Sequence, residues 1–96
     1  MDWIRMLRDK RAVIREYAAR HGASNLRIFG SVVRGEAEST SDVDLLVDME
    51  QGRSLLDLIG LNQDLEELLE CDVDVVTEGD LSPHFRHQVI REAVPL

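Results

Sequence analysis

Apolar residues at the start of the chain recur at the three- and four-residue spacing of an amphipathic helix. They include Ile4, Leu7 and Ile14, and Gly22 follows at a position that suits helix termination. The pattern predicts one helix over residues 2–21.

Three short apolar runs further along the chain are typical of buried strands, because turn-forming or polar residues bound each of them. They cover residues 26–29, 43–47 and 73–76. The first run ends at Gly30-Ser31, and we expect a polar loop or short helix between the first and second strands.

Two further helices have recognisable beginnings. Ser54 with Asp57 three residues later is a capping pattern, and it leads into a leucine-rich helical period that ends before Asp72. Ser82-Pro83 opens a final helix, because serine caps a first turn and proline is tolerated in it. The predicted apolar stripe of that helix is Phe85, Val89, Ile90 and Ala93.

The order of these elements predicts an α/β (α+β) fold, in which helices pack on a small mixed three-stranded sheet. The 96 residues suffice for one compact domain, so we interpret residues 1–96 as a single domain without a second one to enclose a substrate. Because only 4% of the residues are aromatic, the core is expected to be aliphatic.

The chain is acidic. Eleven Lys and Arg against nineteen Asp and Glu give a formal net charge of −8. This charge opposes direct binding of nucleic acid, which depends on cationic contacts to phosphate. It suits association with a basic partner protein.

A cytoplasmic location is predicted. Cys71 is the sole cysteine, so no internal disulfide can form and a reducing compartment is expected. No apolar run approaches the ~18 residues of a membrane span, and residues 1–11 mix acidic and basic side chains instead of leading into an apolar signal core. We therefore expect no membrane association.

Two carboxylates at the start of the second predicted strand are candidates for a metal site. Side chains alternate along a strand, so Asp42 and Asp44 share one face while Val43 and Leu45 point into the core. Paired carboxylates repel each other and favour a cation between them. Mg²⁺ is the expected ion, because it takes one or two protein carboxylates and completes its shell with water and substrate phosphates.

A phosphate site is expected at the end of the first strand. Glycine lets the backbone approach an anion closely, so Gly30 and Ser31 would present N–H groups and a hydroxyl to phosphate oxygens. Arg34 would add positive charge. If the first two strands are antiparallel, this turn lies beside Asp42 and Asp44.

Asp74 is predicted to be a third carboxylate of the site, provided that the third strand runs parallel to the second. Asp72 is the alternative on the same face. Asp74 is preferred because it lies deeper among valines, where a carboxylate is costly unless it has a function. Asp74 would bridge a second metal ion or take the proton of an attacking hydroxyl. Such a site favours in-line attack on an α-phosphate with pyrophosphate leaving.

The segments Gly30-Ser31-Val32-Val33-Arg34-Gly35 and Ser41-Asp42-Val43-Asp44-Leu45 resemble the signature of the DNA-polymerase-β-like nucleotidyltransferases. Small size and the flanking segments resemble one group among them, the minimal nucleotidyltransferase (MNT) antitoxins of HEPN/MNT toxin–antitoxin pairs. The likeness covers nearly the whole chain. One departure is Val33, where such proteins often carry alanine.

This resemblance implies that Asp42, Asp44 and Asp74 bind Mg²⁺ and that Gly30 and Ser31 bind the triphosphate of ATP. It also implies a partner, a HEPN ribonuclease toxin, with a tyrosine hydroxyl that receives AMP. The chain is therefore interpreted as a Mg²⁺-dependent protein adenylyltransferase that acts as an antitoxin.

Two other functions fit parts of the sequence. A non-catalytic antitoxin would mask a basic face of its toxin with the −8 surface and would inhibit it without ATP. A small-molecule nucleotidyltransferase would need a homo-oligomer to enclose its acceptor, because no second domain is expected.

Overall fold

The protein is described by a computed structural model over residues 2–38 and 42–96. Its helices are α1 (Trp3–Asp9), α2 (Arg11–Arg20), α3 (Ser31–Arg34), α4 (Leu55–Leu69), the 3-10 helix η1 (Glu78–Asp80) and α5 (Pro83–Glu92). Its strands are β1 (Ala23–Phe29), β2 (Val43–Met49), β3 (Val73–Val76) and β4 (Val94–Pro95). Ser41 of the signature lies outside the described residues. No helix in the described ranges is long and apolar enough to cross a membrane.

The strands form one mixed sheet in the order β3-β2-β1-β4. Strand β2 is antiparallel to β1 and parallel to β3, and β4 is antiparallel to β1. The predicted fold class and both predicted strand directions are therefore confirmed. The predicted count of three strands is wrong, because β4 adds a fourth that is only two residues long and contains a proline, too little for an alternating pattern to reveal.

The first predicted helix is two helices. Lys10 leaves the helical conformation at φ −99° and ψ 10°, and its N–H donates to the carbonyl of Leu7, three residues back. The chain therefore turns between α1 and α2. Leu7 and Ile14 are seven residues apart, a spacing that keeps the helical period across the break and so conceals it in the sequence.

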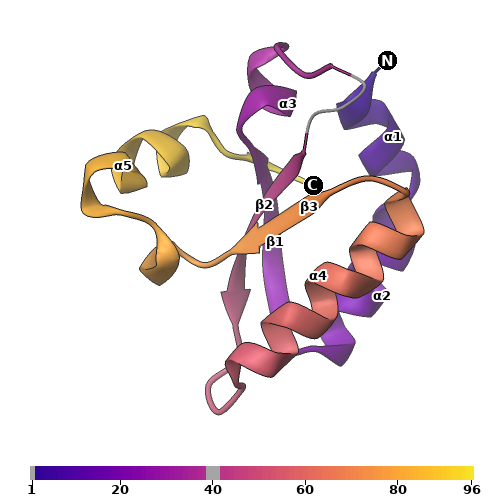
Figure 1. Cartoon of the computed structure of the whole chain (residues 1–96), viewed down its shortest axis with the longest axis vertical. Helices are drawn as coiled ribbons and strands as arrows, with labels where there is room; N and C mark the ends of the chain where they lie inside the picture. The colour runs from indigo at the N-terminus through magenta and orange to yellow at the C-terminus, as the bar shows by residue number, and fades with distance from the viewer. Residues whose placement is uncertain (1, 39–41) are drawn as a thin grey trace.

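Helices α1, α2 and α4 cover one face of the sheet, whereas α5 lies on the other side (Figure 1). The fully buried side chains between the covered face and these helices are aliphatic. They include Leu7, Ile14, Ile28, Val43, Leu45, Leu61 and Leu65. Trp3 is the one buried aromatic side chain in the described ranges, in keeping with the expected aliphatic core.

The long helix α4 begins and ends at recognisable signals. Ser54 and Asp57 form the predicted capping box, and Glu70 closes the helix in the left-handed conformation at φ 54°. Capping contacts of this kind stabilise a helix by about 1 kcal/mol. Only some of the regularly spaced leucines of α4 belong to the core, because the side chain of Leu55 at the helix start is 70% exposed.

Side chains of α4 also protect the free edge of the sheet. The outward N–H groups of β3 donate to α4: Val75 to the Asn62 Oδ1 atom at 2.9 Å, and Val73 to the Glu66 Oε2 atom at 3.3 Å. An edge strand with unpaired N–H groups would invite pairing with another chain. These two contacts satisfy that edge from within the molecule.

Replacing Asn62 with leucine is expected to lower the free energy of unfolding by about 1–2 kcal/mol, because it leaves the buried N–H of Val75 without its acceptor. Urea denaturation measures the loss, and light scattering reports association through the opened edge. Gln63→Leu, at the neighbouring exposed position of α4, is the matched control. An equal loss in both variants would show that the acceptor at Asn62 is unimportant.

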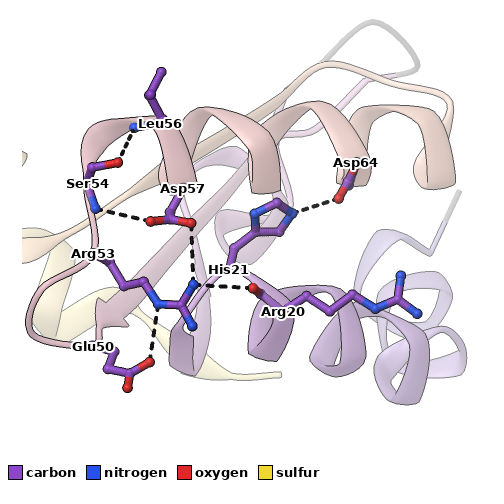
Figure 2. Close-up of polar contacts among 8 residues, drawn as sticks. All are labelled: Arg20, His21, Glu50, Arg53, Ser54, Leu56, Asp57 and Asp64. Atoms are coloured by element: carbon purple, nitrogen blue, oxygen red, sulfur yellow. Dashed lines mark hydrogen bonds and ion pairs between the residues drawn. The ribbon is translucent and has the colours of Figure 1, made fainter.

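Arg53 contacts residues near the ends of β2 and α2 and at the beginning of α4 (Figure 2). Its Nε atom lies 3.3 Å from Glu50 Oε2, and its Nη1 atom lies 3.5 Å from Asp57 Oδ1 and 3.5 Å from the carbonyl oxygen of Arg20. These contacts link the ends of β2 and α2 to the beginning of α4.

His21 joins α2 to the middle of α4 (Figure 2). Its Nε2 atom lies 2.7 Å from Asp64 Oδ2, and its ring fills the space above Gly60. A Cβ atom at Gly60 would come within 2.8 Å of His21 Cε1. The close approach of the ring explains a glycine in a helix interior, where it costs about 1 kcal/mol relative to alanine.

Candidate active site

Asp44 and Asp74 lie on the face of the sheet that α1, α2 and α4 leave uncovered, whereas Asp42 precedes β2 and is exposed. Val43 and Leu45 are fully buried on the covered face, so the alternation of β2 directs Asp44 to the opposite one. The parallel register pairs Asp44 with Asp74, and the antiparallel register pairs Asp44 with Phe29. Two of the three predicted carboxylates are thus direct neighbours on adjacent strands.

The surroundings of Asp44 disfavour its charged form. Its pKa is raised from 3.8 to about 6, first because burial removes water from the carboxylate and then because Asp74 and Asp42 are negatively charged. The positive charge of Arg34 opposes the shift, and Glu92 adds to it. A cation placed among these carboxylates would favour the charged form of Asp44 and so oppose the shift of its pKa.

Asp74 and Asp72 differ in their relation to Asp44. Asp74 lies within β3 and is its direct partner in the sheet, whereas Asp72 precedes the strand and its carbonyl accepts the N–H of Val43 at 2.9 Å. The geometry therefore favours Asp74 as the third carboxylate.

Gly30 brings the turn after β1 into contact with Asp44. Its backbone has φ 79° and ψ −153°, a combination that essentially only glycine adopts. A Cβ atom at this position would overlap Asp44 Oδ2 and lie 3.1 Å from Asp44 Cγ. The glycine is needed both for its conformation and for its lack of a side chain. Ser31, the next residue, begins α3.

Glu92 at the end of α5 binds two of the groups that the sequence assigns to phosphate. Its Oε2 atom accepts the N–H of Gly30 at 3.1 Å, and its Oε1 atom lies 2.8 Å from Arg34 Nη1. Arg34 also contacts Glu36 through Nε at 3.1 Å. Hydrogen bonds to Glu36 and Glu92 raise the pKa of Arg34, which is a cation in any case. The turn at Gly30 and the side chain of Arg34 therefore already bind one anionic group, the carboxylate of Glu92.

A cavity of about 400 Å³ lies between this turn and α5. Its lining combines the site with one face of α5: Phe29, Gly30, Arg34, Asp44, Phe85, Gln88, Val89 and Glu92. Its size is within the ~300–1,000 Å³ range of small-molecule sites.

The contribution of α5 to the site was not predicted from the sequence. Phe85 and Ile90 belong to its predicted apolar stripe, yet their side chains are 60% and 40% exposed, and no side chain of this helix is buried. Helical spacing identifies a face without revealing what covers it. One available signal was Glu92, an acid seven residues after Phe85 and three after Val89, and thus on the same face as both.

Among residues 2–38 and 42–96, no group of three or more His, Cys, Asp or Glu side chains that could hold a metal ion is present. A site for Mg²⁺ here would therefore rest on fewer protein carboxylates than the three predicted aspartates. Mg²⁺ usually binds one or two carboxylates and leaves its other positions to water and phosphate. Asp44 and one neighbouring aspartate, beside the turn that is predicted to bind phosphate, would meet that requirement.

If the pocket receives the triphosphate of ATP, as the sequence predicts, Glu92→Gln is expected to tighten the binding of ATP roughly 3- to 10-fold, because it removes one negative charge beside the polyanion. The amide oxygen can still accept the N–H of Gly30. Calorimetric titration with ATP at fixed Mg²⁺ measures the change. Glu36→Gln, which removes the other acidic partner of Arg34 without touching Gly30, should change affinity less. Weaker binding by Glu92→Gln would show instead that Glu92 orients Arg34 toward the nucleotide.

Comparison with known proteins places the chain in a family. The family described as Nucleotidyltransferase domain matches residues 10–96, so the chain belongs to it and is a nucleotidyltransferase. It is 45% identical over 80 residues to the protein adenylyltransferase MntA of Thermococcus cleftensis, an alignment that covers 83% of this chain and 81% of MntA.

Two solved structures share its fold. A protein provisionally named as a minimal nucleotidyltransferase has a TM-score of 0.84 and 52% sequence identity, over 96% of this chain and 94% of the other. A toxin–antitoxin structure with AMP-PNP has a TM-score of 0.72 over 85% of this chain and 68% of the other; at 24% identity this similarity concerns the fold alone.

Proposed function

We propose that the chain is a Mg²⁺-dependent protein adenylyltransferase that acts as an antitoxin. It transfers AMP from ATP to a tyrosine hydroxyl of a partner toxin, a ribonuclease of the HEPN class. The observation that carries this proposal is the position of Asp44, which lies across from Asp74 and in contact with the Gly30 turn. A relative named as a protein adenylyltransferase supports the protein acceptor. The toxin partner agrees with the occurrence of the same fold in a toxin–antitoxin structure.

The turn after β1 holds the triphosphate in this proposal. The N–H of Gly30 and the hydroxyl of Ser31 donate hydrogen bonds to phosphate oxygens, and Arg34 supplies a positive charge. The Glu92 carboxylate accepts hydrogen bonds from both Gly30 and Arg34. ATP must therefore displace this carboxylate or share the two donors with it.

The aspartates position the reacting groups. Asp42 and Asp44 hold Mg²⁺, which when bound would neutralise charge on the phosphates. Asp74 takes the proton of the acceptor hydroxyl as its oxygen attacks the α-phosphorus in line. The bond from the α-phosphorus to the bridging oxygen breaks, and pyrophosphate leaves with that oxygen. Asp74 is exposed, so a macromolecular hydroxyl can approach it.

We further propose that residues 1–96 act as one domain in the cytoplasm, where ATP is available. The acidic surface, with its net charge of −8, would favour docking onto a basic partner. The same docking without chemistry would make the chain a masking antitoxin.

ATP labelled at the α- or γ-phosphate distinguishes these two functions. With Mg²⁺ and the partner toxin, the proposal predicts covalent transfer of the α-label only, and none after chelation by EDTA. Suppression of the toxin without ATP, with no label on it, would overturn the catalytic proposal in favour of masking.

A further inference from the structure

Phe85 is an exposed aromatic side chain on a helix that packs loosely against the rest of the chain. It is 60% exposed, and α5 buries none of its side chains. The helix is anchored mainly by polar contacts, including those from Glu92 to Gly30 and Arg34. The ring of Phe85 therefore adds little to the core and is accessible to another molecule.

The surroundings of Phe85 are those of the active site. Helix α5 stands beside the uncovered face of the sheet (Figure 1), and Phe85 lines the same 400 Å³ cavity as Gly30, Arg34 and Asp44. Ile90, the other exposed apolar residue of α5, does not line it. The cavity therefore combines the charged groups of Arg34, Asp44 and Glu92 with the apolar side chains of Phe29, Phe85 and Val89.

A nucleoside triphosphate also combines charged and apolar parts, with a polyanionic chain at one end and a flat aromatic base at the other. We propose that Phe85 is the platform on which the base of the nucleotide stacks while its phosphates occupy the Gly30 turn. This inference rests on the proposed nucleotide site. Because every base has a π-face, stacking of this kind supplies affinity for the nucleotide without selecting one base.

Two chemically matched probes test the platform in the absence of any acceptor. The first is α,β-methylene-ATP, which carries a base but cannot release AMP, and the second is inorganic tripolyphosphate, which has no base. Phe85→Ala is expected to weaken binding of the first about ten-fold in calorimetric titration with Mg²⁺ and to leave binding of the second unchanged. Phe85→Tyr should restore the affinity, because it restores the ring.

Ile90→Ala is the matched control, since it removes an exposed apolar side chain from the same helix outside the cavity. It should leave both affinities unchanged. In transfer assays Phe85→Ala should raise the KM for ATP and leave kcat at saturating ATP close to that of the wild type.

An unchanged affinity for α,β-methylene-ATP in Phe85→Ala would overturn the proposal. A higher KM for the acceptor protein with an unchanged KM for ATP would overturn it too, because Phe85 would then contact the partner. Neither result affects the adenylyltransferase assignment. A different result is a wild type that transfers no AMP while Phe85→Ala still binds the nucleotide more weakly than the wild type does. In that case the stacking platform is supported and the proposed function is wrong.

Discussion

Asp44→Asn is expected to abolish AMP transfer and, at neutral pH, to make the metal-free protein more stable. Activity should fall by at least ~10³-fold, because the variant loses one of the two carboxylates assigned to Mg²⁺. Stability should rise because a charged Asp44 is disfavoured in the folded state by burial and by Asp74 and Asp42. Opposite effects on activity and stability are typical of residues kept for function.

The sign of the pH dependence follows from the pKa of Asp44, which rises from 3.8 to about 6 on folding. Between these values the folded state binds more protons than the unfolded state, so the free energy of unfolding falls as pH rises through this window and then stays lower. Since Asp44 is only half-buried, we discount the shift for solvent screening and expect a gain of about 1 kcal/mol in Asp44→Asn at pH 7.

Thermal unfolding in EDTA from pH 4 to pH 7 measures this effect, and 1 kcal/mol corresponds to roughly 4–8 °C in Tm for a domain of this size. Asp48→Asn is the matched control, because Asp48 is on the same strand but pairs with Arg27 at 2.9 Å, away from the site. It should keep its activity and gain no stability. If Asp44→Asn is less stable than the wild type at pH 7, the electrostatic description of the site is wrong.

Gly30→Ala is expected to lower the free energy of unfolding by about 2–4 kcal/mol and to remove nucleotide binding. The new Cβ atom would be placed at φ 79° and ψ −153° and would overlap Asp44 Oδ2, so backbone strain and steric repulsion act together. Either the Asp44 carboxylate rotates away or the turn moves, and both changes separate the proposed phosphate site from the proposed metal site.

Gly35→Ala provides the comparison for Gly30→Ala in urea denaturation and ATP titration. Gly35 also has a positive φ, of 73°, but a Cβ atom there would meet nothing within 4 Å. We expect a loss of about 1–2 kcal/mol from the left-handed conformation alone and near-normal ATP binding. Equal losses in the two variants would mean that the contact with Asp44 contributes nothing.

The sequence predicts the part of the site that local rules govern. The apolar runs locate the strands that bring Asp44 and Asp74 side by side. Asp42, which alternation along β2 assigns to the same face, precedes the strand, and the phosphate turn at Gly30-Ser31 stays a prediction. These inferences concern residues within single strands and turns, where periodicity and backbone preference decide the geometry.

The parts that escaped prediction depend on contacts between distant segments. Glu92 and Gly30 are 62 residues apart, and no local pattern reports their hydrogen bond. The exposure of Phe85 depends on where α5 lies relative to the sheet, which its own spacing cannot reveal. The turn at Lys10 and the short strand β4 escaped because one preserves the helical period and the other is too short to show a period.

The central claim is that the carboxylates beside the Gly30 turn transfer AMP to a partner protein. Intact mass spectrometry of the partner toxin tests it most directly, after incubation with ATP, Mg²⁺ and either the wild-type chain or Asp42→Asn/Asp44→Asn. The account predicts that the toxin gains whole AMP units with the wild type and none with the double variant. An unmodified toxin that the wild-type chain nevertheless silences, or an equal gain with the double variant, would contradict it.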